Sequence, residues 1–117
     1  MREELEKVVE LQKLMGYYDL AQRSKTFKME YLRNITLATH VELTEFLQEV
    51  SWKPWCNDET ITEQQALKAA DELTDVMVFT LVLWATLNPT VEIDKALKAT
   101  FDKIEKRIKE TCYGNHS

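Results

Sequence analysis

Five acidic residues lie at helical spacing on two segments of the chain, where they could bind a metal ion together. Glu42, Glu45 and Glu49 stand on one segment, and Glu72 and Asp75 stand on the other. Residues three apart on a helix lie one turn from each other, with β-carbons about 5–6 Å apart. Two antiparallel helices can therefore bring four such carboxylates together. Oxygen ligands without histidine or thiolate suit Mg²⁺, with Mn²⁺ as the alternative.

These acids adjoin the apolar faces of their helices rather than the solvated faces. At 100° per residue, Ile35 and Phe46 project within about 40° of Glu42, and Phe79 projects within about 20° of Glu72. A carboxylate in apolar surroundings costs several kcal/mol unless it is neutralised, paired or bound to metal. The sequence places no lysine or arginine between residues 41 and 51 or between 72 and 87. We therefore expect a cation from solution to be the partner of these acids.

The remainder of the sequence limits the class of protein. The 117 residues predict one domain over 1–117, and 20 acidic against 15 basic residues give a net charge of −5. This sign disfavours a nucleic-acid partner. The apolar run 76–87 is shorter than the ~20 residues that span a bilayer, so no membrane partner is expected.

The cysteine content and the start of the chain predict a cytoplasmic protein. The 2 cysteines are too few for a disulfide framework or a four-thiolate zinc site. The polar start of the chain does not resemble a secretory signal. A carboxylate-bridged di-iron bundle is not expected either, because it needs Glu-x-x-His on two helices.

Apolar periodicity predicts an all-α fold with four or five helices, packed as a bundle and oligomeric. Expected helices run from about 2 to 18, 34 to 50, 60 to 87 and 88 to 110. We expect Asn34 to cap the second helix, or Tyr31 to begin it earlier. Thr60 with Glu63 has the form of a capping box for the third, and Asn88 before Pro89 predicts the start of the fourth. Pro54 ends the second helix, and the one long loop covers residues 52–60.

Two segments resemble the signatures of the all-α nucleoside triphosphate pyrophosphohydrolases, the MazG-like superfamily. The first signature is RNITLATHVELTEFLQEVSW at 33–52, and the second is DELTDV at 71–76. Within that superfamily, Trp52-Lys53-Pro54-Trp55 is most similar to the dimeric dUTPase branch. The dCTP pyrophosphatase branch shares the first tryptophan. The resemblance covers residues 12–107.

The resemblance implies a helical core that dimerises, and a metal site in that core. The implied Mg²⁺ ligands are Glu42, Glu45, Glu72 and Asp75, with Mn²⁺ as a possible substitute. One of the glutamates, or Glu49 beside them, would polarise the attacking water.

Further residues are expected to contact the substrate. The dimeric dUTPases carry an asparagine and arginine pattern in the last helix, and this chain has Ile104, Glu105 and Lys106 there instead. The predicted contacts are Gln12 for the base edge, Trp52 and Trp55 for stacking on the base, and Arg33, Lys53, Lys103 and Arg107 for phosphates. Alternatively, either tryptophan belongs to the core and Lys53 is a solvated loop lysine.

The sequence thus predicts an Mg²⁺-dependent enzyme that hydrolyses a nucleoside triphosphate to the monophosphate. The expected substrate is dUTP, with dCTP or dATP next. The other product is pyrophosphate or successive phosphates, and the attacked phosphorus and the number of metal ions stay open. The expected partner is a second copy, as a homodimer or a dimer of dimers. The alternative is a non-catalytic helical dimer that acts as a protein-interaction module.

Overall fold

The structure, a computed structural model, describes residues 1–17, 20–50 and 60–112. The elements are α1 (Arg2–Leu14), the 3-10 turn η1 (Leu20–Gln22), α2 (Lys25–Glu49), α3 (Glu63–Leu87) and α4 (Ile93–Cys112). No strand occurs in these ranges, and the four helices confirm the predicted all-α fold. The expected tryptophan loop, with Trp52, Lys53 and Trp55, lies outside the described residues.

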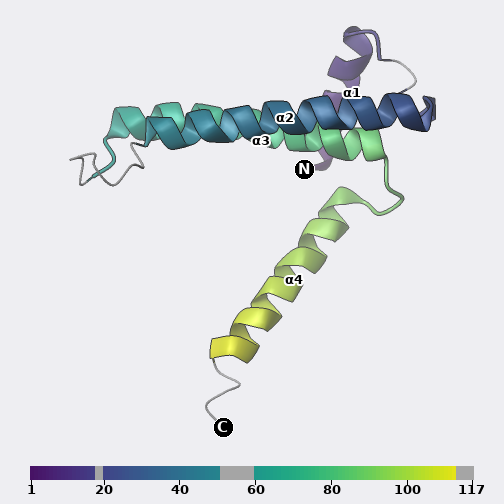
Figure 1. Ribbon diagram of the computed structural model, residues 1–117. Coiled ribbons are helices and arrows are strands. Elements are labelled where there is room, and N and C mark those ends of the chain that lie inside the picture. Colours follow the sequence, from purple (N-terminus) through teal and green to yellow (C-terminus); the bar gives the residue numbers. More distant parts are fainter. Residues whose placement is uncertain (18–19, 51–59, 113–117) are drawn as a thin grey trace.

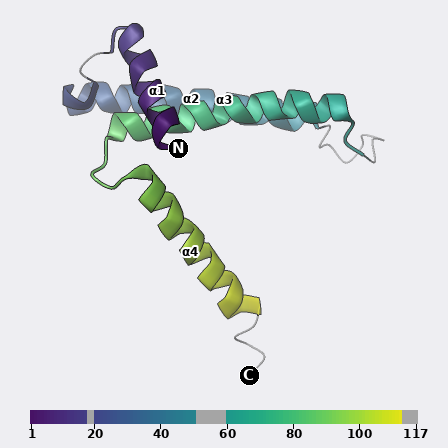
Figure 2. The same ribbon diagram turned by 180° about the vertical axis from the view of Figure 1, so that it is seen from behind.

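Helices α2 and α3 form the long body of the molecule. Each has 25 residues and they run side by side in opposite directions, as both ribbon views show (Figures 1 and 2). Helix α1 crosses this pair and packs on α3, whereas α4 leaves the pair at an angle. The α2–α3 pair is therefore the scaffold that holds the predicted acids.

The small core lies where α1, the end of α3 and the start of α4 meet. Val8, Leu81 and Ile93 form this cluster, and Leu97 packs against it. Full burial of each such side chain contributes about 1.5–3 kcal/mol. The first turns of α4 are thus attached to the body.

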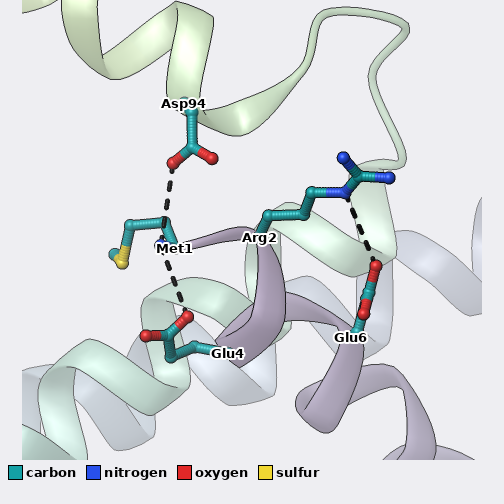
Figure 3. A network of polar contacts seen from close by, with 5 residues as sticks. All are labelled: Met1, Arg2, Glu4, Glu6 and Asp94. Atoms are coloured by element: carbon teal, nitrogen blue, oxygen red, sulfur yellow. Dashed lines mark ion pairs between the residues drawn. The ribbon is translucent and has the colours of Figure 1, made fainter.

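An ionic network at the chain's first residue adds to this attachment (Figure 3). The α-amino group of Met1 lies 3.3 Å from a Glu4 carboxylate oxygen and 3.6 Å from one of Asp94, in the first turn of α4. The hydrogen bond to Glu4 and the charge of Asp94 raise the pKa of this amino group. Arg2 pairs with Glu6 within α1, 3.6 Å apart.

The third helix begins at a capping box, two residues after the predicted one. The Thr62 hydroxyl accepts from the Gln65 backbone N–H at 3.1 Å, and the Gln65 side chain accepts from the Thr62 N–H at 2.9 Å. The expected box of Thr60 and Glu63 is therefore wrong. Glu63 is the first residue of α3, so it cannot occupy the third position that a capping box requires.

The second helix begins earlier than expected. It starts at Lys25, and the Ser24 hydroxyl caps it by accepting from the Phe27 N–H at 3.2 Å. The predicted starts at Asn34 or Tyr31 are wrong because Phe27, Met29 and Tyr31 in the first turns alternate at a spacing of two and give no helical period.

Two further helix boundaries also differ from the prediction. Asn88 takes the left-handed conformation, with φ 47°, and ends α3 instead of starting the next helix. Its N–H bonds to the Trp84 carbonyl at 2.9 Å. Helix α1 ends at Leu14 rather than near residue 18, shortly before Gly16 at φ 97°.

Among the helices that the structure describes, none combines the length and apolar character required to cross a membrane.

Candidate functional site

Three of the five predicted acids converge between α2 and α3. Glu42 and Glu45 come from α2 and Glu72 comes from α3, and one carboxylate oxygen from each lies within 4.8 Å of the other two. The antiparallel packing of the two helices produces this arrangement, because it places the Glu-x-x-Glu turn opposite the turn of Glu72. We call Glu42, Glu45 and Glu72 the acidic cluster.

The environment of Glu72 opposes its ionisation. A hydrogen bond with Glu42 has the largest effect and raises the pKa of Glu72; burial and the charges of Glu42 and Asp75 act in the same direction. A hydrogen bond with Glu45 partly offsets them. The Glu72 Oε2 atom is buried and has no hydrogen-bond partner within the described ranges. A buried oxygen without a partner is costly, and a bound cation would satisfy it.

No cation of the described chain neutralises the acidic cluster. The ion pairs found among the described residues join other groups, in α1, in α4 and between Met1 and Asp94. A set of carboxylate oxygens without nitrogen or sulfur donors fits Mg²⁺ or Mn²⁺.

The other two predicted acids lie close to the acidic cluster but outside it. Asp75 is exposed one turn further along α3, and its charge reaches Glu72. Glu49 is half-buried in the last turn of α2, one turn after Glu45. The two residues extend the acidic face in opposite directions along the pair of helices, because the helices are antiparallel.

Gln12 lies in an apolar cavity rather than on the surface. The residue is only 6% exposed, and its Nε2 donor is buried with no partner in the part of the chain that the structure describes. The cavity has a volume of about 180 Å³ and lies between α1, α2 and α3. It is lined by Val8, Leu11, Gln12, Met15, Tyr31, Ile35, Val78, Phe79 and Val82.

This cavity and the acidic cluster lie on the same face of the α2–α3 pair. Ile35 stands seven residues before Glu42, and Phe79 stands seven residues after Glu72. Seven residues are close to two helical turns, or about 10 Å. An amide donor in a pocket is therefore placed two turns from a cation-binding set of oxygens.

The three predicted basic contacts that the structure describes are not at the acidic cluster of the same chain. Arg33 is exposed and lies nine residues before Glu42, which places it on the opposite side of α2. Lys103 and Arg107 are exposed on the part of α4 that stands away from α2 and α3 (Figures 1 and 2).

Two residues near the site were not predicted from the sequence. Tyr31 lines the cavity with Gln12, and its ring lies 5.1 Å from the ring of Tyr17. Tyr31 stands four residues before Ile35, and residues four apart share a helix face. This spacing could have placed Tyr31 beside the cavity. Lys68 is exposed on α3 four residues before Glu72, and the same spacing identifies it as a cation on the acidic face.

Comparison with protein families identifies the class of molecule. A family model described as dUTPase matches residues 3–113. The chain therefore belongs to the all-α dUTPase family, which confirms the resemblance seen in its two acidic signatures. Comparison with curated proteins and with solved structures gave no match. At the level of the family, the chain is a nucleotide pyrophosphatase of the kind that hydrolyses dUTP.

Proposed function

We propose that this chain hydrolyses dUTP to dUMP and pyrophosphate with Mg²⁺, and that dCTP or dATP are its next best substrates. Water adds to phosphorus, the bond that joins the α-phosphate to the β-phosphate through oxygen breaks, and pyrophosphate leaves. The observation that carries the proposal is the convergence of Glu42, Glu45 and Glu72 within 4.8 Å, with no cation of the described chain among them.

The acidic cluster supplies most of the metal ligands. Glu42, Glu45 and Glu72 would hold Mg²⁺ or Mn²⁺ with Asp75, and the unpartnered Oε2 of Glu72 supports this role. A divalent ion bound there neutralises phosphate oxygens and lowers the pKa of water. The residues of α2 and α3 keep the carboxylates in place, and the antiparallel pair leaves their oxygens facing one another.

The cavity around Gln12 is proposed as the base site. A glutamine amide offers both N–H donors and a carbonyl acceptor, which suits the alternating acceptor and donor edge of uracil. Among the residues that the structure describes, the buried Nε2 of Gln12 has no partner, so a bound base would provide one. The separation of about 10 Å from the acidic cluster suits a nucleotide that places its base in the cavity and its phosphates at the acids.

Glu49 is proposed as the group that accepts a proton from the attacking water. It is half-buried, follows the cluster by one turn, and is outside the group of three converging carboxylates. A carboxylate within reach of the attacking water can accept a proton from it as a general base. Trp52 and Trp55 are proposed to stack on the base, and Arg33, Lys53, Lys103 and Arg107 to contact phosphates.

The experiment that tests the proposed function is turnover over a panel of deoxynucleoside triphosphates. We expect dUTP to give equal amounts of dUMP and pyrophosphate in Mg²⁺ and no product in EDTA. Thermal unfolding with the same panel is the second readout, because a ligand that binds the folded chain raises the melting temperature. A non-catalytic interaction module would show neither turnover nor a shift that needs both Mg²⁺ and nucleotide, and that result would refute the proposal.

A further inference from the structure

The cavity around Gln12 has the size of one six-membered ring. Its volume is about 180 Å³, and its lining is apolar apart from Gln12 and the hydroxyl of Tyr31. A cavity of about 150 Å³ with apolar walls holds a benzene-sized ring. Uracil and cytosine each consist of one such ring, whereas adenine and guanine consist of two fused rings. The space itself therefore favours a pyrimidine base over a purine base.

Tyr31 stands at the end of the cavity that is remote from the acidic cluster. It lies 11 residues before Glu42 on α2, or about 16 Å along the helix, whereas Ile35 lies about 10 Å from Glu42. A nucleotide with its phosphates at the acids directs the outer edge of its base toward this end. The ring of Tyr31 is therefore the wall that a larger base meets.

The ring of Tyr31 is held by contacts across the connection between α1 and α2. It lies 5.1 Å from the ring of Tyr17, with the two planes tilted by 57°. Tilted rings at this distance attract each other. Tyr17 is fixed in turn, because its backbone N–H donates to the Gln12 carbonyl at 2.9 Å. Gly16, at φ 97°, takes the left-handed conformation that turns the chain back at this point.

These contacts connect the amide of the cavity with its end wall. Gln12 presents the buried amide, and its own carbonyl holds Tyr17 against Tyr31. Two other lining residues, Leu11 and Met15, are 41% and 73% exposed. Exposed side chains change rotamer readily, so these two residues set no fixed limit to the space. Tyr31 is the wall of this end that a packed neighbour keeps in place.

We propose that Tyr31 determines the size of base that the cavity admits, and that Tyr17 is the positioning residue that holds Tyr31 in place. The wall leaves room for uracil and cytosine and excludes adenine and guanine. This inference rests on the proposed function, because that proposal assigns the cavity to the base. It also orders the two further substrates, since dCTP should be hydrolysed more efficiently than dATP.

The test is the ratio of kcat/KM for dUTP to kcat/KM for dATP. Tyr31→Ala opens the end of the cavity, so we expect kcat/KM to rise for dATP and to fall for dUTP. The ratio should therefore decrease by at least about tenfold. A variant that is only less stable lowers both values and leaves the ratio unchanged. Tyr31→Phe keeps the ring and should keep the wild-type ratio.

Tyr17→Ala tests the positioning role. It should lower the ratio by less than Tyr31→Ala does, because the ring of Tyr31 remains but loses its neighbour. The double variant should have the ratio of Tyr31→Ala alone, since Tyr17 acts through Tyr31. Phe27→Ala is the matched control and should keep the wild-type ratio, because Phe27 lies one turn before Tyr31 on α2 and does not line the cavity. If thermal unfolding shows that Tyr31→Ala is not folded, Tyr31→Leu removes the ring with a smaller loss of apolar contact and should lower the ratio in the same way.

Three outcomes would overturn the inference while wild-type turnover of dUTP stands. They are a wild-type kcat/KM for dATP as high as that for dCTP, a wild-type ratio in a folded Tyr31→Ala or Tyr31→Leu chain, and additive effects of Tyr17→Ala and Tyr31→Ala. Absence of turnover in the wild-type chain would instead refute the proposed function on which the inference rests.

Discussion

Glu72 is the single residue on which the chemistry of the acidic cluster depends most. It is half-buried beside Glu42 and Glu45, and one of its oxygens finds no hydrogen-bond partner in residues 1–17, 20–50 and 60–112. The hydrogen bond with Glu42 and burial both raise its pKa. A carboxylate that resists ionisation in the metal-free protein is a cost to the fold, and a divalent cation at the cluster would remove that cost.

The first prediction concerns stability against pH in metal-free protein. Below about pH 4.5, both the folded and the unfolded chain carry the proton on Glu72, so its raised pKa has no effect on stability. As pH rises above this value, the unfolded chain releases the proton first, and the folded state is progressively destabilised. Glu72→Gln removes this loss, so we expect its free energy of unfolding to exceed that of wild type by an amount that grows until pH passes the raised pKa of Glu72 and stays constant above it.

Urea unfolding in EDTA over a pH series measures this difference. Glu63→Gln is the control, since Glu63 is exposed in the first turn of α3 and outside the cluster. Parallel curves for wild type and Glu72→Gln across the whole series would contradict the assignment of a strained carboxylate.

The second prediction concerns Gln12. Replacing a buried donor that lacks a partner by an apolar group of similar shape is neutral or stabilising. Gln12→Met should therefore keep or raise the free energy of unfolding, by up to about 1 kcal/mol. The same change should raise the KM for dUTP by about tenfold, because the base loses a hydrogen bond. Gln64→Met, at an exposed position of α3, should leave both quantities unchanged. A destabilised variant with wild-type KM would show that Gln12 serves the fold and not the base.

At the scale of the elements, the antiparallel pair of α2 and α3 turns two sequence patterns into one site. The class of fold and the pairing of the acids could be predicted, because three-residue spacing on a helix fixes a shared face. The residues at which the helices begin and end could not be predicted. An asparagine before a proline can either cap the start of a helix or end the preceding one. The left-handed conformation of Asn88, which ends α3, is known only from the structure. The position of α4 away from α2 and α3 could not be predicted either, because periodicity identifies an apolar face but not the element that covers it.

The third prediction tests the capping box at the start of α3. Thr62→Ala removes the acceptor of the Gln65 N–H, which costs about 1 kcal/mol in the free energy of unfolding. Thr90→Ala, in the exposed connection between α3 and α4, is the matched control and should change stability by less than about 0.5 kcal/mol. Denaturant unfolding of the two variants is the measurement, and equal midpoints for both would contradict the cap.

At the scale of the whole molecule, one chain has a small core and a large apolar surface. The buried cluster joins α1, α3 and the start of α4, while α2 and most of α4 leave apolar side chains exposed. The acidic cluster is nevertheless complete within one chain, because all three of its carboxylates come from α2 and α3. Metal binding should therefore depend on both helices of one chain.

The measurement that tests this account most directly is Mn²⁺ binding, followed by the loss of the free-ion signal in electron paramagnetic resonance. It is made with and without a dUTP analogue that cannot be hydrolysed. The account predicts that wild type binds Mn²⁺ and that Glu45→Gln on α2 and Glu72→Gln on α3 each weaken binding by at least about tenfold, whereas Glu63→Gln does not. Equal Mn²⁺ affinity in wild type and both cluster variants would contradict the claim that carboxylates from the two helices bind one cation site.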